Sequence, residues 1–445
     1  MQFMKKLIPQ TFAYRIWRYL YSLVLTLCLP LLLLLMRKKL KMPSLSADMP
    51  KRRFAERFGR VSSSFQAGGL LIHCASVGEI NAAQRLIRDL LVTNPSLSIT
   101  LSCSSTTGAV HAFNLFKDQV QHQFLPFDLP FFMSPFFNAL KPQLVLVTEV
   151  EIWPNMLAQC LARDVPVCLI NGRLSDQSFT TYKRLSPLLR TALRHFNYIC
   201  AQSQSSYDNF LKLGVYKPQL RLTQNMKFDL ALSSDDQEKA EQLQSQFFSE
   251  SRPVLVAAST HDGEEKFVLQ VYKKLLIDTP NLALIVVPRH PHRFDDVYYI
   301  LKAGGVELAR ASATSLDASV SVDVVLMDKM GWLKACYDIC DVAFIGGSIA
   351  NKGGHNALEC ALYGKPMLMG PSTFNNPSIT QFLHKQGALK IIENTQQCAD
   401  AINHWLADLD NARNDGGKGK QVLQDNNGAV NATLAVLKPL LQRFL

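Results

Sequence analysis

The sequence lacks several short motifs that would fix its chemistry at once. It has no GxxxxGK[ST] loop, which argues against a P-loop nucleotide triphosphatase. No Asp-x-Asp pair stands at the end of an apolar run, so we expect no metal ion and no other cofactor in the site. Its ten cysteines include one close pair, Cys336 and Cys340, with no further ligands nearby. Scattered thiols of this kind are typical of buried side chains in a reducing compartment.

Net charge is also missing from most of the chain. The formal charge of +11 arises within the first 60 residues, which carry 13 Lys and Arg residues against two acidic ones, and the remainder is neutral. A nucleic-acid-binding protein usually spreads its basic residues over a folded face, so we expect no nucleic-acid partner. Here the excess flanks an apolar segment, which favours contact with an anionic membrane surface.

That apolar segment is the uncharged run of 18 residues at 19–36. As a helix it would be about 27 Å long, close to the thickness of a hydrocarbon core. The seven basic residues at 37–53 outnumber the four before the run, which predicts that the folded part stays in the cytoplasm. No small-x-small cleavage site follows. We therefore expect residues 1–42 to be a retained single membrane anchor with a basic collar, and an interfacial or re-entrant helix is the alternative.

Two series of short apolar runs alternate with amphipathic stretches after the anchor. Such runs, bounded by turn residues, are typical of buried parallel strands joined by helices. The first series comprises 70–76, 98–105, 144–149, 165–171, 198–203 and 220–225. The second comprises 254–259, 283–289, 324–328, 342–348 and 366–370.

The polar stretch 233–250 separates the two series and is an interdomain helix or linker. The pattern predicts an α/β protein with two Rossmann-like domains, 43–235 and 236–445, and we expect the last helix to pack back on the first domain. Ligands of open parallel sheets bind at the carboxyl ends of the strands. We therefore expect the active site in a cleft between the domains.

Acidic residues follow two strands of the first domain. Ser76 and Glu79 are spaced as a helix capping box, and Glu79 is alternatively a general base. Glu149 and Glu151 end the strand at 144–149, where they are either helix-terminal acids or working carboxylates whose charge raises the pKa of Glu79.

Two basic residues end later strands of the same domain. Arg173 is a candidate for receiving an anionic group of the acceptor, or a solvated turn residue. Lys227 is a candidate for a phosphate or carboxylate contact, or a surface lysine.

Four motifs of the second domain point to a nucleotide. Thr260 begins a segment that either binds a phosphate or simply caps a helix. Arg289 is the leading candidate for a phosphate clamp, and His290 is its partner or a turn histidine. The pairs Gly346-Gly347 and Gly353-Gly354 allow backbone to approach a ligand closely. Glu359, one turn into the following helix, is placed to bind ribose hydroxyls.

These motifs resemble, in order, those of the lipid A Kdo transferase family, where Kdo is 3-deoxy-D-manno-octulosonic acid. The matching pieces are HCASVGE (73–79), EVEIWPN (149–155), NGRLS (171–175), NMKFD (225–229), ASTHDGEE (258–265), VPRHP (287–291) and GGS with GGHNALE (346–359). The resemblance implies a GT-B fold, attachment to the cell inner membrane, and inverting, metal-independent transfer of Kdo from CMP-Kdo to a lipid A precursor.

The resemblance also implies residue roles. Glu79 is the expected catalytic base, and Glu149 is a second essential acid near the acceptor. The expected donor-binding residues are Lys227, Thr260, Arg289, His290, Gly347, Ser348, Asn356 and Glu359.

Three positions depart from the pattern common in the family. Gln224 stands where Gly is frequent, His292 where Glu is frequent, and Trp332 where Glu is common. The last change argues against a conserved side-chain role at position 332. Two other functions remain open: a GT-B transferase that uses a UDP-sugar and an envelope lipid, or a non-catalytic membrane-bound nucleotide-sugar binding protein.

Overall fold

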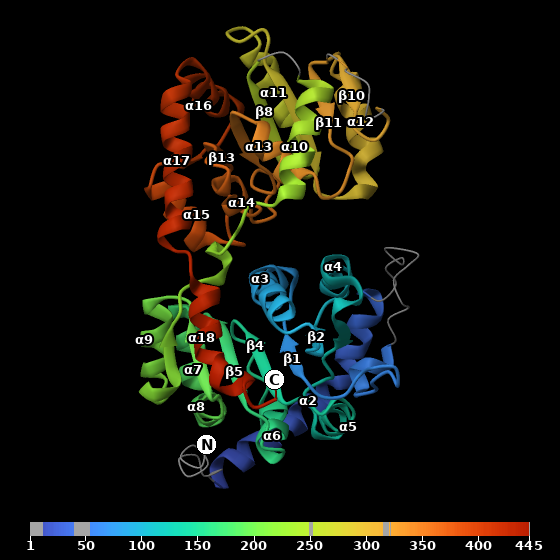
Figure 1. Cartoon of the computed structure of the whole chain (residues 1–445), viewed down its shortest axis with the longest axis vertical. Coiled ribbons are helices and arrows are strands. Elements are labelled where there is room, and N and C mark those ends of the chain that lie inside the picture. Colours follow the sequence, from blue (N-terminus) through green and yellow to red (C-terminus); the bar gives the residue numbers. More distant parts are fainter. Residues whose placement is uncertain (1–11, 40–53, 249–251, 315–319, 321, 445) are drawn as a thin grey trace. The chain divides into compact units, whose positions relative to one another are not determined.

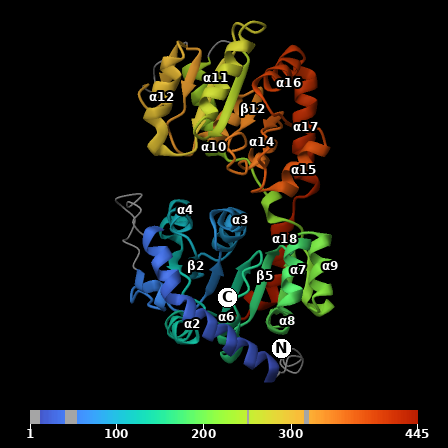
Figure 2. The same ribbon diagram turned by 180° about the vertical axis from the view of Figure 1, so that it is seen from behind.

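A computed structural model describes residues 12–39, 54–248, 252–314, 320 and 322–444 (Figures 1 and 2). The chain forms two compact units, each of which we describe by itself. Unit 1 comprises Met1–Asp229 and Gly428–Leu445, and unit 2 comprises Leu230–Asn427. Each unit is built on one parallel sheet of seven strands.

The sheet of unit 1 has the strand order β3-β2-β1-β4-β5-β6-β7. Its strands are β1 (Leu70–His73), β2 (Ile99–Cys103), β3 (Gln121–Phe124), β4 (Leu144–Thr148), β5 (Val167–Gly172), β6 (Tyr198–Ala201) and β7 (Leu220–Leu222). The chain winds outward in both directions from β1 and β4, which pair in parallel from Leu70 with Leu144. The carboxyl ends of these two strands are therefore the switch point, where ligands of doubly wound sheets bind.

Buried side chains of this sheet form a separate core on each face. Leu71 and Val145 point into the core that α5, α6 and α8 cover, whereas Leu70 and Leu144 point into the core that α3 and α18 cover. The α-helices are α2 (Phe12–Lys39), α3 (Val77–Thr93), α4 (Thr106–Phe116), α5 (Pro130–Leu140), α6 (Pro154–Ala162), α7 (Asp176–Arg184), α8 (Ser186–Arg194), α9 (Gln204–Lys212) and α18 (Ala429–Leu441). Short 3-10 helices are η1 (Phe54–Phe58), η2 (Lys117–Gln119), η3 (Lys217–Gln219) and η4 (Met226–Phe228).

The sheet of unit 2 has the strand order β10-β11-β9-β8-β12-β13-β14. Its strands are β8 (Val254–Thr260), β9 (Ala283–Pro288), β10 (Leu308–Arg310), β11 (Val324–Leu326), β12 (Val342–Ile345), β13 (Met367–Met369) and β14 (Leu389–Ile391). Its switch point lies at the carboxyl ends of β8 and β12, which also pair in parallel.

The helices of unit 2 include α10, which the sequence predicted as a polar interdomain helix. It packs on α13 within this unit. The helices are α10 (Ser234–Phe247), α11 (Glu264–Leu275), η5 (Pro291–Arg293), α12 (Phe294–Ala303), α13 (Leu333–Ile339), α14 (Ala357–Leu362), α15 (Pro377–Lys385), α16 (Thr395–Ala407) and α17 (Leu409–Asp425).

The predicted α/β class with two Rossmann-like units is confirmed. Each of the eleven predicted apolar runs coincides with a strand, and three further strands, β3, β10 and β14, were not predicted. All three are edge strands. Helix α2 supplies the predicted apolar N-terminal helix, because its segment Phe12–Leu35 is long and apolar enough to cross a membrane. Residues 1–11 and 40–42 of the predicted anchor lie outside the described residues.

Candidate functional site

Glu79 lies at the switch point of unit 1, in the first turn of α3, and is only 7% exposed. Its carboxylate accepts hydrogen bonds from the backbone N–H of Ala75 and from the hydroxyls of Ser76 and Thr148. Ser76 in turn caps the helix by accepting from the Glu79 N–H. Half of the predicted capping box is present, because the Glu79 carboxylate returns to the N–H of Ala75 and not to that of the cap residue Ser76.

Burial raises the pKa of Glu79 above its ordinary value, and the hydrogen bonds from Thr148 and Ala75 oppose this rise. The negative charges of Glu149 and Glu151 raise the pKa further. These two acids come from the turn after β4, the strand that pairs with β1. The site therefore combines a desolvated carboxylate with two like charges, both of which favour proton uptake by Glu79.

Glu149 is held in an uncommon conformation. Its φ of 53° lies in the left-handed region, which costs a residue with a side chain of the order of 1–3 kcal/mol. Its Oε1 lies 2.9 Å from the Nζ atom of Lys227, with both side chains about one-fifth exposed. Lys227, predicted as a donor-binding residue, is therefore a direct partner of Glu149 within unit 1.

Two residues of this cluster were not singled out from the sequence. His73 is fully buried, and its Nε2 lies 3.6 Å from the Oε2 of Glu151. Thr148 donates to Glu79 and also to the carbonyl oxygen of His73. Both end the central strands β1 and β4, and their position beside the acids was the one available signal. Thr148 orients the carboxylate of Glu79, and His73 lies beside that of Glu151.

Arg173 follows β5 near the same edge, and its backbone N–H donates to the carbonyl oxygen of Glu149. Its side chain is half-buried, and its guanidinium has no hydrogen bond or ion pair with any described residue. The preceding Asn171 is buried and binds the backbone N–H of Met226, which holds η4 and Lys227 in place. An unpaired guanidinium at this edge suits an anionic ligand.

The switch point of unit 2 holds a carboxylate of the protein itself. Glu264 is fully buried and accepts hydrogen bonds from the backbone N–H groups of Gly347, Ser348, Ile349 and Ala350. The sequence predicted that backbone here approaches a ligand. In the structure these four N–H groups bind Glu264, a residue of the ASTHDGEE motif to which the sequence had assigned no role.

Glycine is required at 346 because of this packing. A Cβ there would lie 2.6 Å from the carbonyl oxygen of Ser259 and 2.9 Å from an oxygen of Glu264. The hydroxyl of Ser348 is also used internally, since it donates to Ile345 and accepts from the N–H of Gly370. Gly347 and Ser348 thus shape the loop through contacts within unit 2.

Thr260 is fully buried, and its hydroxyl donates to Glu265. Glu265 also forms an ion pair of 2.7 Å with Arg293. The Thr260 hydroxyl, predicted to bind a phosphate, is therefore committed to this pair. Asn356 caps α14 by accepting from the N–H of Leu358, and its amide donates to Glu359. It positions Glu359 at the start of that helix.

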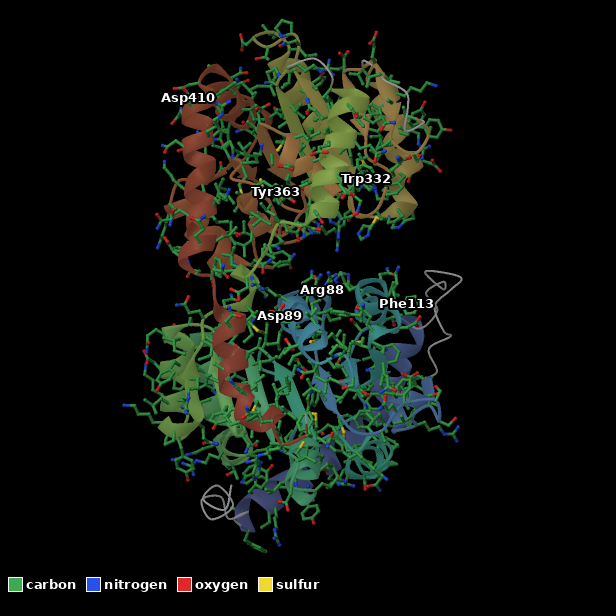
Figure 3. All side chains as sticks on the ribbon, viewed as in Figure 1. Arg88, Asp89, Phe113, Trp332, Tyr363 and Asp410 are labelled. Atoms are coloured by element: carbon green, nitrogen blue, oxygen red, sulfur yellow. The ribbon has the colours of Figure 1, made fainter. Side chains whose placement is uncertain are left out.

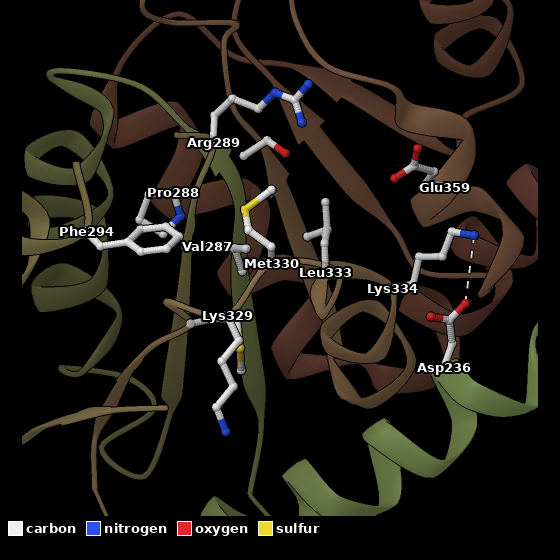
Figure 4. Close-up of a pocket in the computed structure, with 13 residues that line it drawn as sticks. Asp236, Val287, Pro288, Arg289, Phe294, Lys329, Met330, Leu333, Lys334 and Glu359 are labelled. Atoms are coloured by element: carbon white, nitrogen blue, oxygen red, sulfur yellow. Dashed lines mark ion pairs between the residues drawn. The ribbon is translucent and has the colours of Figure 1, made fainter. Parts of the chain in front are cut away.

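A pocket of about 310 Å³ opens at the carboxyl ends of β8, β9 and β11 (Figure 4). It brings together two residues that the sequence predicted as donor-binding, Arg289 and Glu359, with Lys329 and Lys334. The Lys334 Nζ atom lies 3.8 Å from Asp236, at one side of the pocket. Its apolar lining consists of Val287, Pro288, Phe294, Met327, Met330 and Leu333. Ser259 and Gly331 also line it. Cations above an apolar floor suit a ligand with a phosphate and a flat base.

Three histidines stand next to Arg289. The Nε2 atoms of His261 and His355 lie 2.8 Å apart, and the ring of His290 packs edge-on against His261. Burial lowers the pKa of all three, and the charge of Arg289 lowers it further, to about 3 for His355. The rings of His261 and His355 are therefore both neutral at pH 7, and in the hydrogen bond between them one ring donates and the other accepts.

Trp332, where the resemblance predicted Glu, packs beside α10 (Figure 3). The ammonium groups of Lys329 and Lys239 lie 5.0 and 5.9 Å from its ring centroid. A cation–π arrangement thus replaces a carboxylate at this edge of the pocket. Within the described ranges, no group of three or more His, Cys, Asp or Glu side chains is placed to hold a metal ion.

Comparison with known proteins matches residues 52–230 to the family model for 3-deoxy-D-manno-octulosonic-acid transferase (kdotransferase). The 3-deoxy-D-manno-octulosonic acid transferase of Haemophilus influenzae is 36% identical over 430 residues, covering 96% of this chain and 99% of its own. The enzyme of the same name from Bordetella pertussis is 33% identical over 330 residues, covering 72% of this chain and 76% of its own.

The fold has solved counterparts. The UDP-GlcNAc 2-epimerase of Neisseria meningitidis, bound to UDP-GlcNAc, superimposes with a TM-score of 0.55 at 13% identity, covering 84% of this chain and 100% of its own. This likeness shows the GT-B fold alone. The near full-length match at 36% identity shows more: the chain belongs to the 3-deoxy-D-manno-octulosonic acid transferase family of glycosyltransferases.

Proposed function

We propose that the chain transfers Kdo from CMP-Kdo to a hydroxyl of a lipid A precursor at the cytoplasmic face of a cell inner membrane. Family membership supports the sugar, because the relative that matches almost the full chain carries that name. The pocket of unit 2 supports a nucleotide donor, since Arg289, Lys329 and Lys334 line it beside Glu359. The apolar segment of α2 supports a membrane-bound acceptor.

The proposed reaction is a direct, inverting displacement without a metal ion. The acceptor oxygen forms a bond to the anomeric carbon of Kdo while the bond from that carbon to the CMP phosphate breaks. Glu79 takes the acceptor proton, and Arg289 neutralises the charge that grows on the leaving phosphate. The observation that carries this assignment is the buried carboxylate at the unit 1 switch point, whose pKa is raised by burial and two neighbouring acids.

Glu149 and Lys227 have a supporting role in the proposal. Their 2.9 Å ion pair fixes a negative charge near Glu79 without leaving it uncompensated. Arg173, unpaired among the described residues, would receive an anionic group of the acceptor. Glu359 would bind the ribose hydroxyls of the donor, as acids do in other nucleotide folds.

The substrates are tested with purified protein, CMP-Kdo and tetra-acylated lipid A precursor, with mass spectrometry of the product. We expect a mass increase of one or more Kdo residues, competitive inhibition by CMP and no inhibition by UDP. Donor binding without a transfer product would favour a non-catalytic binding protein. Inhibition by UDP and not by CMP would favour a UDP-sugar transferase.

The base is tested by Glu79→Gln, with Ser76→Ala as the matched control. Both changes disturb the hydrogen bonds at the start of α3, but only the first removes the carboxylate. We expect Glu79→Gln to lower kcat by at least about 100-fold while both variants unfold at similar temperatures. Near-normal turnover of Glu79→Gln, or an equal loss in Ser76→Ala, would assign Glu79 to helix capping alone.

A further inference from the structure

One face of α2 is less exposed than the rest of the helix, and Tyr14 and Tyr21 on this face pack into the core of unit 1. The buried and half-buried side chains of this helix recur every three or four residues, as expected for a single helical face. They are Tyr14, Arg18, Tyr21, Ser22, Leu25, Leu29, Leu32 and Leu33. From Tyr14 to Leu33 this stripe extends about 28 Å at the helical rise. Both views show α2 crossing unit 1 lengthwise, from near α8 past α6 toward α5 (Figures 1 and 2).

Polar contacts fix the register of this packing. The Tyr14 ring packs edge-on against His195, at the carboxyl end of α8, with ring centroids 5.2 Å apart. Two turns on, the hydroxyl of Ser22 accepts a hydrogen bond from the side-chain amide of Asn155 in α6. Asn155 also binds the backbone of Asp128, a buried residue before α5. The helix is therefore docked on unit 1 by specific side chains along its first half, and half-buried leucines continue the same face along its second half.

The opposite face of α2 is exposed and almost wholly apolar. Its large exposed side chains are Phe12, Ile16, Trp17, Tyr19, Leu20, Leu23, Val24, Leu27, Leu31, Leu34 and Leu35. The centre of this face is a line of side chains directly opposite the docked stripe: Ile16, Leu20, Leu23, Leu27 and Leu34. Polar side chains stand at the edge of the face, as Arg15 and Thr26 do.

These observations conflict with a helix that crosses a bilayer while docked. A spanning helix would carry the packed surface of unit 1 into the hydrocarbon, together with α8 and its Arg190 and Arg194. Arginine at the centre of a bilayer costs roughly 2.5–3.5 kcal/mol even on insertion scales. An interfacial helix has no such cost, because its apolar face enters the lipid only about 5–10 Å and its other face stays on the protein.

We propose that α2 lies in the plane of the membrane, with the line from Ile16 to Leu34 in the acyl chains and unit 1 seated on the lipid surface. The exposed face contacts an anionic bilayer, because the first 60 positions of the sequence hold 13 basic residues against two acidic ones. Trp17 and Tyr19 beside the line suit the headgroup level. This inference rests on the membrane attachment in the proposed function and replaces a spanning anchor by an in-plane one.

The test measures the depth of single labelled positions. Cys28 is exposed and the other nine cysteines are buried, so Cys28→Ser gives a background without a reactive thiol on the native fold. Leu20→Cys, Leu27→Cys and Leu34→Cys are then labelled one at a time with an environment-sensitive fluorophore. The full chain is bound to phosphatidylethanolamine–phosphatidylglycerol vesicles that carry quenchers at known depths.

An in-plane helix places positions 20, 27 and 34 at one shallow depth, although they span about 21 Å of helix. In an in-plane helix, a label on Thr26→Cys also lies nearer the headgroups than a label on the adjacent position 27. A spanning helix instead gives depths that differ along the chain, with position 27 near the bilayer centre and position 34 near the headgroups. That pattern, or failure of the protein to bind the vesicles, would overturn the proposal.

A second measurement uses the helix end. Ala13→Cys in the same background should react with a membrane-impermeant maleimide in inverted vesicles and not in intact spheroplasts. Labelling from the outer side would show a span. Neither experiment depends on Kdo transfer, which is assayed separately on the labelled proteins with detergent-dispersed substrates. Loss of transfer with equal depths would overturn the proposed function and leave the in-plane helix standing.

Discussion

The chemistry of Glu79 depends on residues that are distant in the sequence. Its hydrogen-bond donor Thr148 ends β4, and the like charges of Glu149 and Glu151 follow that strand. The sequence predicted this repulsion because both strands end in acids. It did not predict Thr148, whose short side chain has no pattern that separates a hydrogen-bond donor from an ordinary buried threonine.

The acid limb of the pH profile tests this electrostatic arrangement. Because the pKa of Glu79 is raised, kcat/KM should fall as the pH drops through a midpoint above the ordinary carboxyl range. Glu151→Gln removes one neighbouring negative charge, which favours the ionised form of Glu79 and should shift the midpoint to lower pH. Glu241→Gln, on the exposed side of α10, is the control and should leave the midpoint unchanged. A shift to higher pH in Glu151→Gln would contradict the repulsion.

The departure at Gln224 falls at a backbone position whose dihedral angle favours glycine. Its φ is 65°, in the left-handed region where glycine is favoured. Gln224→Gly should raise the free energy of unfolding by about 1 kcal/mol, since the strain of a side chain in this region exceeds the entropy that glycine adds to the unfolded chain. Gln224→Ala keeps the Cβ and should bring no gain. Urea unfolding of the two variants measures the difference, and equal stabilities would contradict the argument.

Glu264 marks the limit of residue-level prediction. The glycine pair at 346–347 indicated close approach of backbone to a ligand, and in the structure the N–H groups from Gly347 to Ala350 bind a side chain of α11. A carboxylate of the protein and a phosphate of a ligand are equally good acceptors for backbone N–H groups. Only the fold, which sets β8 beside β12, distinguishes between them.

At the scale of elements, the strands that sequence patterns missed have a common cause. β3, β10 and β14 are edge strands, and β10 has no fully buried residue. An edge strand buries less of its surface, so it needs no continuous apolar run. The central strands, buried on both faces, were all predicted for the same reason. Sequence patterns therefore located the switch points, which depend on central strands, better than the extent of either sheet.

One carboxylate caps the start of helix α18. Asp229 accepts hydrogen bonds from the first three backbone N–H groups of the helix segment, those of Gly428, Ala429 and Val430. Asp229→Ala should lower the free energy of unfolding of unit 1 by about 2 kcal/mol, at the upper end for a helix cap, because the aspartate is buried. Thermal unfolding checks this.

The matched control for this cap is Asp408→Ala. Asp408 caps α17 through one hydrogen bond to Asn411 and is exposed, so its loss should cost no more than about 1 kcal/mol. An equal effect of the two substitutions would show that the threefold bonding of Asp229 adds nothing.

At the scale of the whole molecule, the two units should respond differently to acid. In unit 2, His261, His290 and His355 all have lowered pKa values, so the unfolded state binds more protons as the pH falls below about 6.5. Stability of unit 2 is therefore lost as the pH falls below that value. In unit 1, burial lowers the pKa of His195 to about 4 but raises that of Asp128 to about 6. As the pH falls, these two shifts have opposite effects on the stability of unit 1.

Hydrogen exchange at pH 7 and pH 5, corrected for intrinsic rates, measures this difference. We expect protection of the β8 and β12 amides to fall more than that of the β1 and β4 amides. A double variant, His261→Gln with His355→Gln, should reduce the loss in unit 2, because neither glutamine takes up a proton. Equal losses in both units would contradict the histidine account.

Asp229 and its partner Gly428 lie 199 positions apart along the chain. During synthesis, a ribosome therefore makes the whole of unit 2 between the two pieces of unit 1. The core on one face of the first sheet stays open to solvent until Val430 and Leu437 emerge to close it. The half of the enzyme that is translated first is thus completed last, and a nascent chain stalled within unit 2 would display an unfinished apolar surface to chaperones.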